Sequence, residues 1–182
     1  PYLIRAEKAY TEKKQEDTTA KEAARVALET FKTIPKGNVS KFKKENKATL
    51  IHQDADGKNH CYFLECAAQD GNIEMVQELL KVDSVKKDKV ILTKAFKTER
   101  KAKDQAVLEM ANLKQGAGAL TQSERIKQIA ELEKKVESYL ATDIMLLVML
   151  KEIRENEDRN RKNEIEGLIK QSTTEMLTVL QK

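Results

Sequence analysis

The segment spanning residues 64–80 constrains the fold of this chain more than any other part of the sequence. Its apolar and small residues recur every three or four positions on both sides of a glycine, which is the period of one helical face. That glycine, Gly71, can adopt the positive φ at which a short helix ends, and Asn72 can accept a backbone N–H at the start of the next helix. The sequence therefore predicts two short helices joined by a tight turn. The positions that carry the pattern are Leu64, Ala67, Ala68, Ile73, Val76, Leu79 and Leu80.

The residues before this helix pair predict a tight turn and indicate a repeat. Segment 50–59 contains aspartate, glycine and asparagine, which are the residue types that tight turns require. A Gly-Asn pair at residues 37–38 precedes the pair at 71–72 by 34 residues, close to the ankyrin period of about 33. Together these features resemble an ankyrin repeat, with a good match over residues 50–82 and a degraded copy over residues 18–49.

The resemblance implies a binding function, because ankyrin units bind partner proteins and as a rule catalyse nothing. They commonly present the turn and the exposed side of the first helix to the partner. We therefore expect polar contacts with another protein at these positions, with Tyr62 as an aromatic anchor. The expected contact residues are His52, Asp54, Asp56, Lys58, Asn59, Tyr62, Glu65 and Gln69. The leading hypothesis is an intracellular protein–protein interaction module that is part of a larger protein and is not an enzyme.

Composition predicts an all-α fold in which the ankyrin-like units pack with longer helices. The chain has 182 residues, only two prolines and six glycines, and 4% aromatic residues, so long helices are unobstructed and a β-rich fold is disfavoured. Two ankyrin-like units do not bury their apolar faces alone, so neighbouring helices must cover them. We expect a helical region over residues 1–114, a linker at 115–121 and a helical bundle or extension over 122–182.

The helices outside the ankyrin-like part are expected from apolar periodicity and capping patterns. Thr19 and Thr121 each begin a capping-box pattern, and Thr142 or Asp143 can cap a further helix. The expected helices are residues 2–16, 19–33, a short one near 39–42, 89–113, one beginning after Thr121, one containing 144–150 and one over 165–180.

The run at residues 144–150 is apolar on every side, so we expect it to be buried all round. We favour the central helix of a bundle, and a contact between copies of the chain is the alternative. A second hypothesis is accordingly a structural or oligomerisation module that assembles through the helices of residues 122–181. A third is the non-catalytic region of a secreted bacterial effector enzyme, which acts in the host cytoplasm.

Residues with catalytic or metal-binding chemistry are few. All histidines and cysteines lie within fifteen positions, but their spacing is wrong for zinc, and an adjacent His60 and Cys61 point in different directions on a helix. We expect the cysteines to pack as small apolar residues, the histidines to lie at the surface, and neither metal nor cofactor to bind. The residues concerned are His52, His60, Cys61 and Cys66.

Charge and hydropathy limit the remaining partners. The net charge of +4 comes from lysines in the N-terminal two thirds, and the scarcity of arginine and aromatic residues there favours a solvated surface over a nucleic-acid site. The longest apolar run, residues 144–150, is far shorter than the ~20 residues of a transmembrane helix. Two cysteines without a disulfide framework favour a reducing compartment, and we expect a cytoplasmic protein.

Overall fold

The computed structural model describes residues 2–32, 50–116 and 120–180, with side chains from 7–27, 50–116 and 120–171. The described residues form six helices and one short β-hairpin, which confirms the all-α prediction. The expected helix near 39–42 lies outside the described residues. The elements are α1 (Tyr2–Lys32), β1 (His52–Gln53), β2 (Asn59–His60), α3 (Tyr62–Asp70), α4 (Ile73–Leu79), α5 (Asp83–Lys86), α6 (Lys89–Lys114) and α7 (Gln122–Leu180).

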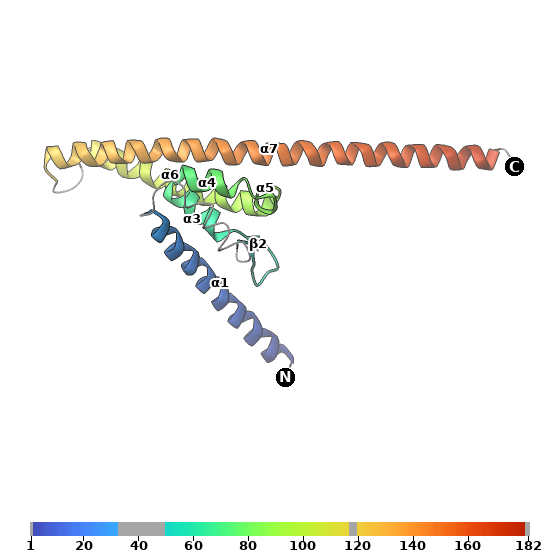
Figure 1. Ribbon diagram of the computed structural model, residues 1–182, viewed down its shortest axis with the longest axis horizontal. Helices are drawn as coiled ribbons and strands as arrows, with labels where there is room; N and C mark the ends of the chain where they lie inside the picture. The colour runs from blue at the N-terminus through green and yellow to red at the C-terminus, as the bar shows by residue number, and fades with distance from the viewer. Residues whose placement is uncertain (1, 33–49, 117–119, 181–182) are drawn as a thin grey trace.

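The elements are arranged along α7, which runs the length of the molecule (Figure 1). Its 59 residues correspond to about 90 Å at 1.5 Å per residue. Helix α6 lies along its first half, the short helices α3 to α5 lie beside that pair, and α1 crosses α3 and diverges from α7. The second half of α7 extends beyond the rest of the fold.

The α3–α4 pair has the local geometry that its sequence predicts. Gly71 ends α3 with φ +67°, and the N–H groups of Gly71 and Asn72 bond the carbonyls of Ala68 and Ala67 in a Schellman arrangement. Asn72 then accepts the N–H of Met75 at 3.1 Å, which begins α4. A Cβ on Gly71 would lie 3.3 Å from Tyr139 of α7, so this turn packs directly on α7.

The predicted turn before α3 is an antiparallel hairpin in which His52 pairs with His60. Its turn is built on Asp54, whose side chain accepts the N–H groups of Asp56 at 3.0 Å and Lys58 at 2.7 Å. Gly57 supplies the positive φ of the turn, +75°. These bonds fix the hairpin without help from a longer sheet.

Helices α6 and α7 form an antiparallel pair joined by the predicted 115–121 break. The second predicted capping box is confirmed, because Thr121 accepts the N–H of Glu124 while Glu124 accepts the N–H of Thr121 at 3.0 Å. Ion pairs of constant register run along the pair and hold the two helices side by side. They are Lys114–Glu133 at 3.3 Å, Lys103–Asp143 at 2.8 Å and Lys89–Glu157 at 2.8 Å.

Three predicted helix starts, at Thr19, at Thr142 or Asp143 and at Ile165, are wrong, because α1 and α7 are continuous. Thr19 donates to the carbonyl of Gln15 at 3.0 Å inside α1, and Thr142 donates to that of Ser138 at 3.0 Å inside α7. A threonine hydroxyl can thus bond the preceding turn instead of capping a new helix. None of the described helices combines the length and apolar composition that a bilayer span needs.

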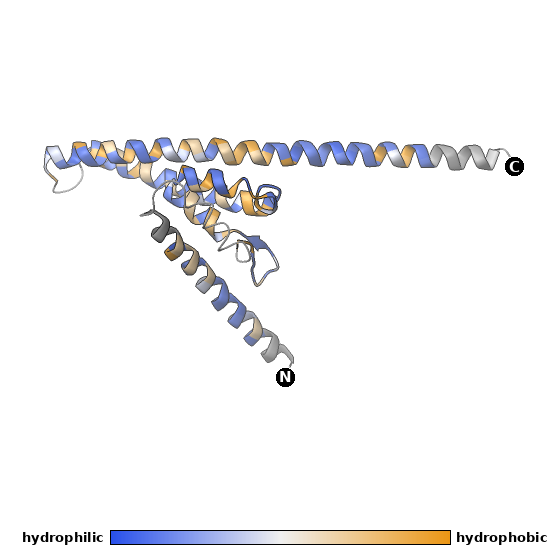
Figure 2. Ribbon diagram, in the orientation of Figure 1, coloured by the Kyte–Doolittle hydropathy of each residue, from blue (hydrophilic) through white to orange (hydrophobic). Residues whose placement is uncertain are grey.

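The core lies where α3 and α4 meet α1, α6 and the first half of α7, and Figure 2 shows apolar residues gathered there. The expectation that the 144–150 run is buried all round is wrong. Leu146 is fully buried, but Ile144 is 63% exposed and Leu147 is 47% exposed. Only one side of α7 faces α6, and the opposite side is left at the surface. The largest fully buried side chains of the core include Leu64, Leu79, Ile91, Leu92 and Leu146.

Candidate functional site

A polar cluster joins the hairpin to α3 and α6, and it contains several of the predicted contact residues. The His60 ring lies between two carboxylates, with Nδ1 2.8 Å from Glu65 Oε1 and Nε2 2.7 Å from Asp54 Oδ2. Lys94 of α6 approaches the same His60 nitrogen and lies 3.5 Å from Asp54. A doubly protonated ring satisfies both carboxylates, whereas a neutral ring protonated at Nδ1 can accept from Lys94.

The hairpin is also tied to α1. Asp17 contacts His52 Nε2 at 2.5 Å and accepts the N–H of Ala55 at 3.2 Å. Nearer the N-terminus of α1, the Tyr10 hydroxyl donates to Asp56 at 3.2 Å. Helix α1 therefore lies over the side of the hairpin and α3 that the sequence predicts to face a partner.

Several of the predicted contact residues accordingly serve the fold. Tyr62 and Glu65 are buried, at 8% and 7% exposed, so their expected exposure is wrong. Tyr62 stacks on His60 with ring centroids 4.8 Å apart, and Asn59 donates to Asp88, the N-cap of α6, at 2.8 Å. His52 and His60, which we expect at the surface, are half-buried.

The other predicted residues lie at the edge of this cluster. Asp56, Lys58 and Gln69 are exposed, as expected. Between α1, the hairpin and α3 lies an open cleft of about 350 Å³. Its lining carries charges of both signs. Lys14 and Lys21 of α1 line it together with Tyr62 and carboxylates that include Asp54 and Glu65.

The electrostatics of the cluster are those of a satisfied structural site. Burial opposes ionisation of Asp54, but hydrogen bonds from the Lys58 N–H and His60, with the charge of Lys94, hold its pKa well below its usual range. Burial, reinforced by the charge of Asp17, raises the pKa of Tyr62 to about 12. An ionised aspartate with three hydrogen-bond donors and a nearby lysine is a poor base, and Tyr62 is a poor acid at neutral pH.

The cysteines pack as predicted. Cys61 is fully buried and Cys66 is 5% exposed, and both are free thiols. Burial raises the pKa of Cys61 to about 12, so this thiol is not a nucleophile at neutral pH. Among the described residues, no group of three or more His, Cys, Asp or Glu side chains is placed to hold a metal ion.

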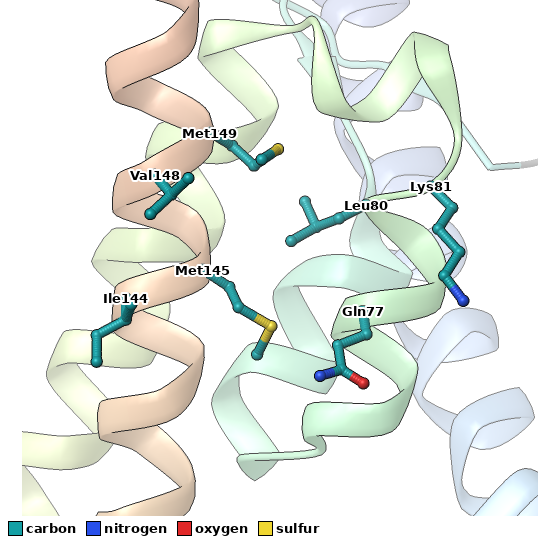
Figure 3. A pocket seen from close by; sticks show the side chains of 7 residues that line it. All are labelled: Gln77, Leu80, Lys81, Ile144, Met145, Val148 and Met149. Atoms are coloured by element: carbon teal, nitrogen blue, oxygen red, sulfur yellow. The ribbon is translucent and has the colours of Figure 1, made fainter.

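A different site, an apolar groove of about 380 Å³, lies between α4 and α7. Figure 3 shows Leu80, the C-cap residue of α4, and Met145 and Met149 of α7 pointing toward the space between the helices. Gln77 of α4 and Lys81 just after it form the opposite rim. The two methionines have flexible, polarisable side chains that adapt to different apolar ligands.

The groove continues onto an exposed apolar face of α7. Ile144, Leu147 and Val148, which we call the proximal triplet, are 63%, 47% and 45% exposed. Ile144 and Val148 also line the groove, at its α7 edge (Figure 3). Scattered exposed apolar residues are ordinary, but a contiguous set beside a groove marks an interaction site.

Sequence reasoning did not assign these residues to a site. The available signal was the 144–150 run itself, whose apolar residues outnumber those that one neighbouring helix can cover. By itself, the sequence of that run predicts mainly a core helix, with a contact between copies as the alternative. Its exposure on one side favours the alternative.

Comparisons with known proteins do not assign this chain to a family. No protein-family model matches the chain, and no curated protein or solved structure is significantly similar to it. Nothing in these comparisons indicates ankyrin repeats, so the resemblance rests on the sequence of residues 50–82 and stays a prediction.

Proposed function

We propose that this chain is a protein-interaction module that binds an amphipathic helix on the apolar surface of α7. This surface comprises the α4–α7 groove and the proximal triplet. The observation that carries the proposal is the exposure of Ile144, Leu147 and Val148 next to a groove lined by Met145 and Met149. A helix with apolar residues at i, i+3, i+4 and i+7 can place one face along such a surface.

The proposal moves the binding surface away from the one that the ankyrin resemblance implies. The polar residues of the hairpin bond to each other and to α1 and α6, so they have little hydrogen-bonding capacity left for a partner. Asp56, Lys58 and Gln69 remain exposed and could contact a partner at the side, but they present no apolar anchor. We propose binding without catalysis.

An intracellular setting is part of the proposal. Cys61, the N-cap residue of α3, and Cys66, within α3, are both free and buried in the core. Buried free thiols are compatible with a reducing compartment, where disulfides rarely form. This supports an intracellular location without identifying the cell.

Selection from a displayed library of helical peptides tests the proposed function. Peptides that bind the immobilised protein should carry an apolar stripe, and Val148→Lys should weaken them by at least about tenfold. Asn163→Lys, at an exposed position of α7 far from the groove, should leave their affinity unchanged. Enriched peptides that bind Val148→Lys as well as the unmodified chain would place the site elsewhere, and no enrichment would contradict the proposal.

A further inference from the structure

The second half of α7 repeats the apolar pattern of the proximal triplet. Ile165, Leu168 and Ile169, which we call the distal triplet, are 51%, 60% and 60% exposed. Each lies 21 residues after its counterpart in the proximal triplet, so both sets have the spacing i, i+3 and i+4. Three heptads separate the triplets by about 32 Å along the axis, with a drift of only about 60° in a straight helix.

The geometry points to a second copy of this chain as the helix that binds the α7 surface, in an antiparallel dimer about a two-fold axis beside Asn156. This inference rests on the proposed function and names its partner. In the dimer, the distal triplet of each copy packs on the proximal triplet of the other. The two-fold axis thus relates two equivalent contacts, which together cover both triplets of both copies. Such self-complementary contacts are the rule for two-fold dimers.

Position along the helix determines which residues meet. With the axis beside Asn156, Ile144 of one copy faces Leu168 of the other, and Leu147 faces Ile165. A left-handed supercoil of two helices removes the drift between the triplets, because it brings residues spaced by 3.5 onto one line. The second half of α7 extends beyond the rest of the fold, so a second helix can approach it (Figure 1).

The charged residues between the triplets favour the antiparallel arrangement. Lys151, Arg154, Asp158 and Arg161 lie 7 or 14 residues after Ile144 and Leu147, so they occupy the central positions of the stripe, which face the partner helix directly. In a parallel dimer each would meet its own copy, which gives four layers of like charge. In the antiparallel dimer Arg154 meets Asp158 of the other copy twice, and two like-charge layers remain, where Lys151 meets Arg161.

The remaining like-charge layers are moderated within each chain. Lys151 lies 3.7 Å from Glu155 on the same helix. Like charges at the contact oppose the parallel arrangement more than the antiparallel one, so the charges select orientation while the triplets supply the apolar contact.

Sedimentation equilibrium on the full chain tests the inference. The mass should rise with concentration from 20.7 kDa toward twice that value. Ile144→Glu and Leu168→Lys, both at exposed positions, should each raise the dissociation constant at least about tenfold. An equimolar mixture of the two variants should recover the dimer, because Glu at 144 then meets Lys at 168 in one contact and the other contact is unchanged. Asn163→Lys, on the opposite side of α7, should dimerise normally.

The outcomes separate this inference from the proposed function. A wild-type chain that stays at 20.7 kDa overturns the dimer, even if library peptides still bind the groove and support the proposed function. A mixture that stays monomeric overturns the antiparallel arrangement, because only a contact between residues 144 and 168 predicts rescue. Circular dichroism of each variant distinguishes loss of the contact from loss of the fold.

Discussion

Two clusters of carboxylates and lysine, one at the hairpin and one between α6 and α7, shift the pKa of their acidic groups in opposite directions. Asp54 at the hairpin accepts two backbone N–H groups and contacts His60, and its pKa lies well below the usual range. Glu99 on α6 is fully buried, and neither of its oxygens has a hydrogen-bond partner among the described residues. Burial, with the nearby charge of Asp143, raises the pKa of Glu99 to about 7.

A nearby lysine is common to both groups, so the opposite shifts come from the hydrogen-bond donors that only Asp54 has and from the burial of Glu99 beside Asp143. Lys94 lies 3.5 Å from Asp54 and Lys103 lies 4.0 Å from Glu99, so both groups have an ammonium neighbour. Only Asp54 also has the backbone donors of a tight turn. A proton on Glu99 lets it donate to Asp143, which removes the repulsion between the two carboxylates.

The comparison also separates structure from proposed function. The polar groups at the hairpin are used in holding α1, α3 and α6 together. The first half of α7, in contrast, buries one side on α6 and leaves the proximal triplet exposed. Substitutions at the hairpin should therefore change stability, whereas those in the proximal triplet should change binding and leave stability within about 0.5 kcal/mol.

The largest expected loss of stability follows Asp54→Ala. The variant loses the turn acceptor and leaves His60 and Lys94 without their shared carboxylate, so urea unfolding at pH 7 should show a loss of about 3 kcal/mol. Asp54→Asn keeps an acceptor for one turn N–H and should lose less. A loss below about 0.5 kcal/mol for Asp54→Ala would contradict the structural role.

The pH dependence gives this prediction a second readout. The pKa of Asp54 is lower in the folded chain than in the unfolded chain, so its ionised form stabilises the fold above pH about 4. That stabilisation is lost as the pH falls below 4 toward the folded pKa. The Asp54→Ala variant should lack this acid-side loss.

Glu99→Gln should have the opposite effect on stability, with a smaller magnitude. The pKa of Glu99 rises from 4.5 to about 7 on folding, so the protonated form stabilises the fold fully below pH 4.5. This stabilisation is lost as the pH rises through 7. Glutamine stays neutral, so at pH 8 the variant should be about 2 kcal/mol more stable than the unmodified chain and about equal to it at pH 4.

The control for Glu99 is an exposed glutamate on the same helix. Glu109→Gln removes one charge from α6 without changing a buried group, so it should leave the difference between pH 4 and pH 8 unchanged. Equal pH profiles for Glu99→Gln and the unmodified chain would show that Glu99 is ionised in the fold. Thermal unfolding at both pH values measures the effect.

Local features of the fold could be predicted from the sequence, because they depend on neighbouring residues. The Gly71 turn, the Asn72 cap and the Thr121 capping box each have the geometry that their residues predict. The sequence did not predict that α1 continues through Thr19 and α7 through Thr142. A threonine hydroxyl can bond the preceding helical turn as well as cap a new helix, so the residue type does not decide between the two.

The site was harder to predict, because burial depends on which helix lies over which face. Tyr62 and Glu65 have residue types suited to a partner contact, but α1 covers the side of α3 on which they lie. The exposure of Ile144 follows from the straight course of α7, which packs on α6 and α4 and leaves one side at the surface. Neither packing choice is determined by local spacing.

The smallest expected effects on the free energy of unfolding come from removing two tyrosine hydroxyls, one on α7 and one on α1. Tyr139 of α7 is 1% exposed and donates to the Gln69 carbonyl at 2.8 Å, so Tyr139→Phe should lower the free energy of unfolding by about 1 kcal/mol. Tyr10 of α1 is 44% exposed and donates to Asp56 at 3.2 Å, so Tyr10→Phe should change it by less than about 0.5 kcal/mol. Water can replace the exposed bond but not the buried one. Equal losses in urea unfolding would mean that α7 docks on the end of α3 no more tightly than α1 docks on the hairpin.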